Sequence, residues 1–287
     1  MPKAAYHLMH PQRRTTAVVF ASPHSGRDYS RSFLRRTNLN DHTVRSSEDA
    51  FVDQLFQDAP RYGAPLIKAG APRAYVDLNR SEEELDPALI EGVRKSGHNP
   101  RIASGLGVIP RVVANGQAIY TGKITMAEAE RRIDTYWRPY HEALSAQLDQ
   151  AHLMFGQAIL IDCHSMPHEA MDTIARTGIR RPEVVLGDRF GAAAAPGIVD
   201  RIEEAFTSAG LVVTRNTPFA GAYVTQRYGR PSRNRHAVQI EIDRALYMNE
   251  QLIRPNGHFE AFRNVLNGVI AEIAAIGRPA HQALAAE

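Results

Sequence analysis

Two imidazoles and several carboxylates stand where apolar runs of this chain end. His24 follows the run "VVFAS", and Asp162 and His164 stand at the end of "AILIDCHS". Glu241 lies inside a third apolar run, "AVQIEID", where an acid is costly unless it is paired or used. Two histidines and one carboxylate are a common ligand set for catalytic zinc, which keeps one coordination position for water. These residue types therefore suggest a metal-dependent hydrolytic site.

The segment "SSEDAFVD" supplies the candidates for the carboxylate ligand, Glu48 and Asp49. Both acids could instead favour a helix N-terminus electrostatically. A metal would lower the pKa of its water to about 7 and polarise a carbonyl. A nearby carboxylate must then take the proton of that water and hand it to the leaving nitrogen, and Glu241 is the candidate for this role.

Each of these assignments has a structural alternative. Any two of the 12 histidines can be surface or hydrogen-bonded core residues, and the sequence has no HExxH or CxxC motif. Side chains two apart on a strand share a face, so Asp162 and His164 are expected to point together and Cys163 away from them. Cys163 could be a nucleophile with a histidine partner elsewhere, but this orientation is more typical of a small buried residue. In "YVDLNR", Asp77 could anchor a turn and Arg80 could form a surface ion pair.

The elements that must position these residues follow from hydrophobic periodicity and from turn residues. We expect one helix from "EDAFVD" to Gly63 and a long helix from the capping-box spacing at Thr125–Glu128 to about Leu153. A helix that Gly210 ends and a final helix over residues 259–276 complete the set. The segment "NTPFAGAYVTQRYGRPS" is expected to be loop or hairpin. The segment "TAVVFASPHSG" (Thr16–Gly26) is expected to be a short buried strand that ends in a loop. Further strands are expected in "APLIKAG", "RAYVDLNR", "QAILIDCHS", "EVVLGDRFG", "LVVTRN" and "HAVQIEID".

Strands that alternate with helices, several of them continuously apolar, indicate an α/β sheet covered by helices on both faces. Ligands bind at the strand ends of such sheets, where the polar residues gather. With no linker or repeat, residues 1–287 are expected to form a single domain. The polar stretch 81–122 is expected to be a loop excursion or lid.

Composition excludes several other classes of protein. The formal net charge of +3 comes from 34 Lys+Arg against 31 Asp+Glu, with no long basic run, so nucleic acid is not an expected partner. No apolar stretch approaches a membrane span, and the N-terminus has no signal pattern. The single cysteine allows no disulfide within the chain. We therefore expect a cytoplasmic protein that does not associate with membranes; the sequence sets no oligomeric state.

Eight short sequence segments together resemble a known protein family. They run in order from about Ser22 to Met248: "PHSG", "EDAFVD", "RAYVDLNR", "GLGVIPR", "DCHSMP", "LGDRFG", "NTPFAGAYVTQRYGRP" and "HAVQIEIDRALYM". Together they resemble the N-formylglutamate amidohydrolase family. The resemblance implies a fold like that of zinc carboxypeptidases, a phosphorylase/hydrolase-like three-layer α/β/α sandwich with a mixed sheet. It also implies hydrolysis of N-formyl-L-glutamate to formate and L-glutamate, as in histidine degradation.

The resemblance also implies roles for individual residues. His24 and His164 look like the imidazole ligands of one zinc ion, with Asp49 favoured over Glu48 as the carboxylate. Glu241 looks like the general base, and Asp162 is a candidate partner of His164 behind the metal.

On the substrate side, Asn79 and Arg80 resemble the pair with which carboxypeptidases grip a carboxylate. Tyr223, in "FAGAYVT", is expected in the wall over the substrate. A substrate with two carboxylates needs a second cation, and the candidates are Arg73, Arg111, Arg227 and Arg230.

Two other functions remain open at this stage. The chain could be a zinc amidase for another N-acyl or N-formyl amino acid or a small peptide. It could also be a catalytically silent protein that binds small molecules on the same scaffold.

Overall fold

The computed structural model describes residues 1–94, 99–172 and 180–279. The chain forms two compact units, each assembled from three separated segments. Unit 1 contains Met1–His7, Pro23–Ala50 and Lys68–Ala143, and unit 2 contains Leu8–Ser22, Phe51–Ile67 and the residues from Leu144 onward. We expected one domain without a linker. Because the chain passes repeatedly between the units, no single linker marks the division in the sequence.

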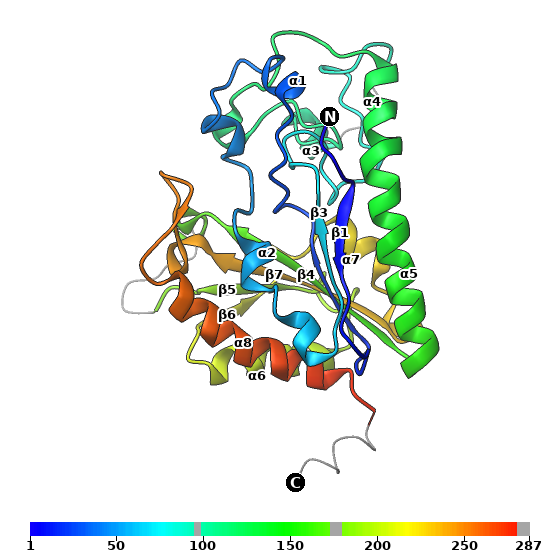
Figure 1. Cartoon of the computed structure of the whole chain (residues 1–287), viewed down its shortest axis with the longest axis vertical. Helices are drawn as coiled ribbons and strands as arrows, with labels where there is room; N and C mark the ends of the chain where they lie inside the picture. Colours follow the sequence, from blue (N-terminus) through cyan, green and yellow to red (C-terminus); the bar gives the residue numbers. More distant parts are fainter. Residues whose placement is uncertain (95–98, 173–179, 280–287) are drawn as a thin grey trace. The chain divides into compact units, whose positions relative to one another are not determined.

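A mixed seven-stranded sheet has the order β1-β3-β2-β4-β7-β5-β6 (Figure 1). β4 is parallel to β2 and β7, whereas β5 runs antiparallel to β7 and parallel to β6. This confirms the predicted α/β class with a mixed sheet flanked by helices. The strands are β1 (Tyr6–Met9), β2 (Val18–Ser22), β3 (Leu66–Ala69), β4 (Ala158–Met166), β5 (Val184–Gly187), β6 (Val213–Arg215) and β7 (Arg235–Asp243), with a separate β8–β9 pair (Met248–Asn249, Arg254–Pro255).

The helices of unit 1 are mostly short, whereas unit 2 includes the longest helices. The α-helices are α1 (Arg31–Leu34), α2 (Val52–Leu55), α3 (Pro100–Ala103), α4 (Met126–Arg132), α5 (Arg138–Phe155), α6 (Pro196–Ser208), α7 (Tyr223–Tyr228) and α8 (Phe259–Ile276). Single turns are η1 (Thr43–Arg45), η2 (Ala59–Tyr62), η3 (Ala114–Gly116), η5 (His168–Met171), η6 (Pro231–Arg233) and η7 (Arg244–Leu246), and η4 (Ile133–Trp137) is π-helical. No helix in the described residues is both long and apolar enough to cross a membrane.

The register of the central strands sets where side chains meet in unit 2. β4 and β7 pair along nine residues, from Ala158 beside Arg235 to Met166 beside Asp243. β2 joins the other side of β4, with Ala21 beside Asp162. The carboxyl ends of these three parallel strands therefore lie next to one another at one edge of the sheet.

Two helices cover the sheet of unit 2 and pack against each other. α8 contacts α6 and β2, and α6 also contacts β5 and β6 (Figure 1). α8 presents Leu266, Ile270 and Ile273 to the interior, at the i, i+4, i+7 spacing of an amphipathic helix. Its end is fixed to the start of β2, because the Gly277 carbonyl accepts a hydrogen bond from the Ala17 amide at 2.9 Å.

Unit 1 contains a buried arginine in an aromatic cage. The guanidinium carbon of Arg132 lies 4.0 Å from the centroid of the Tyr75 ring, and Nη1 donates to the Tyr120 hydroxyl at 2.6 Å. Nε donates to Glu128 at 2.8 Å, so the buried charge has a carboxylate partner. The cation–π contact and the ion pair offset the desolvation cost of the guanidinium.

The structure corrects four sequence expectations. "RAYVDLNR" is not a strand, because the Pro72 carbonyl accepts the amides of Tyr75 and Val76 and the Asp77 carboxylate accepts the amide of Asn79. The expected helix ending at Gly63 is divided into α2 and η2, and the helix from Thr125 is interrupted by the π-helical η4. The "NTPF…" segment contains α7, whose buried Val224, Thr225 and Tyr228 face the core of unit 2. Packing of this face against β4 and β7, rather than local propensity, accounts for α7.

The stretch 81–122 belongs to unit 1 and includes residues 95–98, which lie outside the described residues. Leu89, Ile90, Val108, Ile109 and Ile119 are buried within it. It therefore contributes to the core of unit 1 despite its polar composition. Its role as a lid stays a prediction.

Gly277 offers a test of the α8–β2 attachment. An added Cβ would lie 2.4 Å from Thr16 Oγ1 and 2.8 Å from the Ala17 amide nitrogen. We expect Gly277→Ala to lower the free energy of unfolding by about 1–3 kcal/mol, the usual cost of overpacking. The exposed helical Gly268 has open space at its Cβ, so Gly268→Ala should raise stability by about 0.5–1 kcal/mol. Urea denaturation of both variants checks the pair; a neutral Gly277→Ala contradicts the tight attachment.

Candidate active site

In unit 2, the carboxyl-terminal edge of the sheet brings His164 beside Glu241. The two residues are Cα partners in the parallel pairing of β4 and β7. Two residues earlier on each strand, Asp162 is the partner of Gln239. Gln239 Nε2 donates to Glu241 Oε1 at 2.7 Å, which fixes one carboxylate oxygen. The pairing unites residues that are far apart in the sequence, as the common strand-end pattern predicted.

Asp162 lies against His164, as its position on the same strand face predicted. Oδ2 of Asp162 is 3.0 Å from Nε2 of His164, and the carboxyl group is fully buried. Neither carboxylate oxygen has an aligned hydrogen-bond partner among the described residues, so the imidazole is its close polar neighbour. A buried carboxylate beside a histidine is the arrangement that orients metal-binding imidazoles.

Cys163 points away from this pair and does not have the properties of a nucleophile. Burial raises the pKa of its thiol well above the usual value, and the charge of Asp162 raises it further. A neutral thiol is a poor nucleophile, so the structural interpretation of this cysteine holds.

In unit 1, His24 lies between two buried carboxylates. Its Nε2 is hydrogen-bonded to Asp77 Oδ1 at 2.7 Å, and its Nδ1 lies 3.5 Å from Asp49 Oδ2. The Asp49 amide also donates to the His24 carbonyl at 3.0 Å, which holds the two segments together. This contact directs Nδ1 of His24 toward the Asp49 carboxylate.

Asp77 has a larger role than the turn anchor considered from sequence. It accepts from the Asn79 amide at 2.8 Å, as a turn anchor does, and also from Arg73 Nε at 3.1 Å and from His24. Burial by itself raises the pKa of Asp77, but the charges of His24, Arg73 and Arg80 hold that pKa well below its usual value. Asp77 therefore remains ionised and can orient His24. In the sequence, the signal for this role was the position of Asp77 in the polar block "DLNR", two residues before Asn79.

The two acids of "SSEDAFVD" have different surroundings. Glu48 accepts from Arg45 through Nε at 3.0 Å and Nη2 at 3.1 Å, and from the Tyr29 hydroxyl at 3.1 Å. These contacts make Glu48 part of a buried ion pair. Asp49 instead lies beside His24, and both acids precede α2 rather than starting it.

Asn79 and Arg80 are buried in the turn that follows Asp77. Arg80 donates through Nε to the Leu106 carbonyl at 3.0 Å and through Nη1 to its neighbour's carbonyl at 2.8 Å. Among the described residues, no carboxylate lies within ion-pair distance of this guanidinium, and burial lowers its pKa. A largely buried arginine with only carbonyl acceptors is suited to receive an anionic ligand.

The structure does not single out a second cation for a substrate with two carboxylates among the four candidate arginines. Arg73 is paired with Asp77 at 3.1 Å and Arg111 with Asp86 at 2.8 Å. Arg227 donates to the hydroxyl of Tyr223, the predicted wall residue at the start of α7, and lines a cavity of unit 2 together with Arg230.

Sequence reasoning missed polar residues just beyond β4 and β7. Arg244 is 8% exposed and donates from Nε to Ser165 Oγ at 3.2 Å. His168 Nδ1 lies 2.7 Å from Asp243 Oδ2, so a histidine–aspartate pair stands at the same edge of the sheet. The rule that polar residues at strand ends form sites would have found them, had it been extended beyond the last apolar residue of each strand.

Comparisons with known proteins agree with these observations. The sequence model of the N-formylglutamate amidohydrolase family matches residues 16–248. N-formylglutamate deformylases of Pseudomonas putida and Pseudomonas aeruginosa are 28% and 29% identical to this chain, over 81% and 80% of its length and 82% of theirs.

Among solved structures, an N-formylglutamate amidohydrolase from Ralstonia eutropha JMP134 has a TM-score of 0.88 and 34% identity; the match covers 95% of this chain and 98% of that one. A protein from Agrobacterium tumefaciens shares the fold, with a TM-score of 0.68 and 16% identity over 96% of this chain and 95% of that one. Given the family match over most of its length and the shared fold, this chain belongs to the N-formylglutamate amidohydrolase family.

Proposed function

We propose that this protein is a metal-dependent amidohydrolase that cleaves the formyl amide of N-formyl-L-glutamate into formate and L-glutamate, a step of histidine degradation. Family membership supports the reaction class, and the names of its relatives support the substrate. The observation that carries the proposal is the pairing of His164 with Glu241 at the carboxyl edge of the sheet. This pairing places an imidazole, a common metal ligand, beside a carboxylate that can accept and donate a proton.

We further propose that His24, Asp49 and His164 are the ligands of one zinc ion. Each residue offers one ligand atom of a type that zinc accepts, and their exposed fractions are only 2%, 1% and 2%. Chain connectivity supports this set, because His24 follows Ser22, the last residue of β2, by two residues. β2 is the direct neighbour of β4, which carries His164. The two residues from Ser22 to His24 span at most about 7–8 Å, so His24 stays near the carboxyl end of β2.

The surroundings of the two histidines fit this role. A ligating imidazole usually donates its other ring nitrogen to a carboxylate, which orients the ring and raises its basicity. Asp77 supplies this contact to His24 at 2.7 Å, and Asp162 lies 3.0 Å from the ring of His164. Asp49 is favoured over Glu48 as the carboxylate ligand because the Glu48 carboxylate already accepts hydrogen bonds from Arg45 and Tyr29.

Bound zinc would supply water of lowered pKa and would polarise the formyl carbonyl. The chain's own contribution to bond cleavage is then proton transfer. Glu241 takes a proton from the attacking water and delivers it to the leaving nitrogen of glutamate. The hydrogen bond from Gln239 holds the carboxylate in place for both transfers.

Substrate binding is assigned to a second group of residues. Arg80 receives the α-carboxylate through its planar guanidinium, and Asn79 adds a polar contact from the same turn. Tyr223, at the start of α7, contributes to the wall over the substrate. For the side-chain carboxylate we favour Arg244, a buried arginine three residues beyond Glu241. Its ion pair with Glu250, at 3.8 Å, is longer than the ion pairs of Arg73 and Arg111, at 3.1 and 2.8 Å.

Replacement of the proposed base tests the proton transfer. Glu241→Gln keeps the shape of the side chain but cannot accept the proton, so formate release should fall by about 10²–10⁴-fold. Zinc content and melting temperature should stay close to wild type. Glu204→Gln, an exposed change on α6, is the matched control and should retain full activity. Zinc-loaded Glu241→Gln that still releases formate at the wild-type rate would falsify the assignment.

Zinc stoichiometry after dialysis tests the ligand set and separates the two acids. Asp49→Asn and His164→Ala should each weaken zinc binding by at least about 100-fold, because removal of a ligand exceeds the usual cost of removing its partner. Glu48→Gln should keep one zinc per chain, as should His7→Ala, an exposed control. Retained zinc in Asp49→Asn together with loss in Glu48→Gln would reverse the choice of carboxylate.

The second cation is tested through substrate selectivity. Arg244→Gln should lower kcat/KM for N-formyl-L-glutamate by about 10–100-fold, the value of one hydrogen bond to a charged group. N-formyl-L-norleucine has no side-chain carboxylate, so its kcat/KM should change little. If Arg227→Gln shows this selective loss and Arg244→Gln does not, Arg227 on α7 binds the side-chain carboxylate instead of Arg244.

A further inference from the structure

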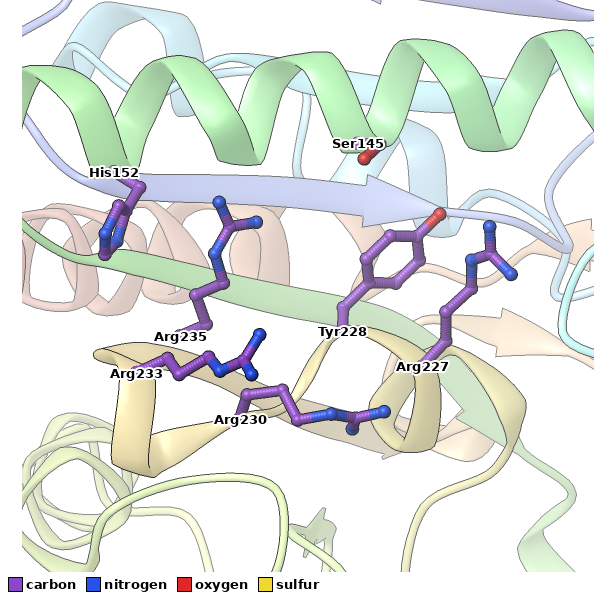
Figure 2. A pocket seen from close by; sticks show the side chains of 7 residues that line it. All are labelled: Ser145, His152, Arg227, Tyr228, Arg230, Arg233 and Arg235. Atoms are coloured by element: carbon purple, nitrogen blue, oxygen red, sulfur yellow. The ribbon is translucent and has the colours of Figure 1, made fainter.

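Unit 2 contains a polar cavity, of about 630 Å³, near the amino-terminal end of β7 (Figure 2). Two of its lining side chains come from α5, and the others come from α7, from Arg230 just before η6, from η6 and from the start of β7. Its lining residues are Ser145, His152, Arg227, Tyr228, Arg230, Arg233 and Arg235.

The cavity carries a concentrated positive charge. Four of its seven lining residues are arginines, and none of the described residues that line it is acidic. Asp149 pairs with one of the four, through Arg235 Nη2 at 2.6 Å. Arg233 has no side-chain partner among the described residues. A cluster with more positive than negative charge attracts anions.

Contacts within the chain hold two of the guanidinium groups in place. Arg230 Nη1 donates to the carbonyls of Gln226 and Gly229, both at 2.6 Å. The guanidinium of Arg227 lies 5.6 Å from the Tyr228 ring centroid and donates to the Tyr223 hydroxyl at 2.8 Å. Held in this way, the two arginines lose little conformational freedom when an anion binds.

His152 adds a polar side chain to the wall. It lines the cavity from α5 (Figure 2), the helix that also supplies Ser145.

This cavity is distinct from the proposed catalytic edge. Arg235 is the first residue of β7, and Glu241 lies six residues further along the same strand. At about 3.3 Å per residue, roughly 20 Å separates the two positions. Arg235, at the far end of the strand, therefore cannot contact a substrate held beside Glu241.

We propose that this cavity binds a small molecule that carries two phosphoryl groups, such as a sugar bisphosphate or a nucleoside diphosphate. The planar guanidinium matches phosphate oxygens with paired hydrogen bonds, and several arginines suit several phosphoryl groups. The volume lies in the range of cavities that hold small organic ligands. Ser145 and His152 add polar contacts along α5.

Isothermal titration calorimetry of the zinc-loaded protein with fructose 1,6-bisphosphate tests the proposal. We expect one site per chain that weakens as salt is added. Fructose 6-phosphate should bind at least about tenfold more weakly, because one charged group is missing. Propane-1,2,3-tricarboxylate tests for a general polyanion site; affinity equal to that of the bisphosphate would overturn the phosphoryl assignment.

Variants locate the binding site. The double variant Arg230→Gln/Arg233→Gln should weaken binding by at least about 100-fold, at tenfold or more for each arginine. Arg201→Gln removes one positive charge from the exposed face of α6, outside the cavity, and should bind like wild type. Unchanged affinity in the double variant, or no binding by wild type at millimolar bisphosphate, would overturn the proposal.

Two further measurements separate this site from the catalytic one and from loss of folding. Arg233→Gln changes an exposed residue, so the variant should fold, bind the bisphosphate at least about tenfold more weakly and release formate at the wild-type rate. Glu241→Gln should bind the bisphosphate normally. Parallel loss of binding and formate release in Arg233→Gln would contradict a separate site, whatever the outcome for the proposed activity.

Discussion

The parallel pairing of β4 with β2 and β7 is the constraint on which the rest of the structure depends. Parallel strands bring their carboxyl ends to one edge, so residues more than 70 positions apart become neighbours without any local signal. His164 and Glu241 meet in this way, and β2, whose last residue precedes His24 by two positions, pairs with β4. A shift of the β4–β7 register by one residue would place Ile240 or Ile242 beside His164. Burial of β4 along its whole length opposes this shift, because a slip by one residue would turn every side chain of the shifted strand to the opposite face of the sheet.

Buried charge is the second theme of this chain, and it is compensated in different ways. Asp77 remains ionised in the interior because a histidine and an arginine contact it directly. Arg132 is stabilised by Glu128 and by the face of an aromatic ring. Arg80 has carbonyl acceptors but no carboxylate among the described residues, and Asp162 has the imidazole of His164 as its near polar neighbour. The first two arrangements are complete within the chain, whereas the last two are the ones that a metal and an anionic substrate would complete.

The two ends of β7 carry opposite chemistry. Glu241, near the carboxyl end, is an acid beside the proposed metal ligand His164, while Arg235 begins the strand within a cluster of arginines suited to an anion. A rigid strand separates these charges by a fixed distance. One element of unit 2 can therefore support two sites of opposite sign without either neutralising the other.

The sequence by itself determined the fold class, most strands and the residue types of the site. Continuous apolar runs predicted β2, β4 and β7, and helical periodicity predicted α8 over Phe259–Ile276, because burial imposes its pattern on the sequence directly. Only the tertiary structure decided which polar residues meet. Residues 73–80 were misassigned because local turn hydrogen bonds replace strand pairing there. α7 was misassigned because its packing against β4 and β7 overrides its local preference. Glu48 and Asp49 are adjacent and chemically alike, and only the positions of Arg45 and His24 distinguish them. A side chain's partner depends on the path of the whole chain, which no local pattern encodes.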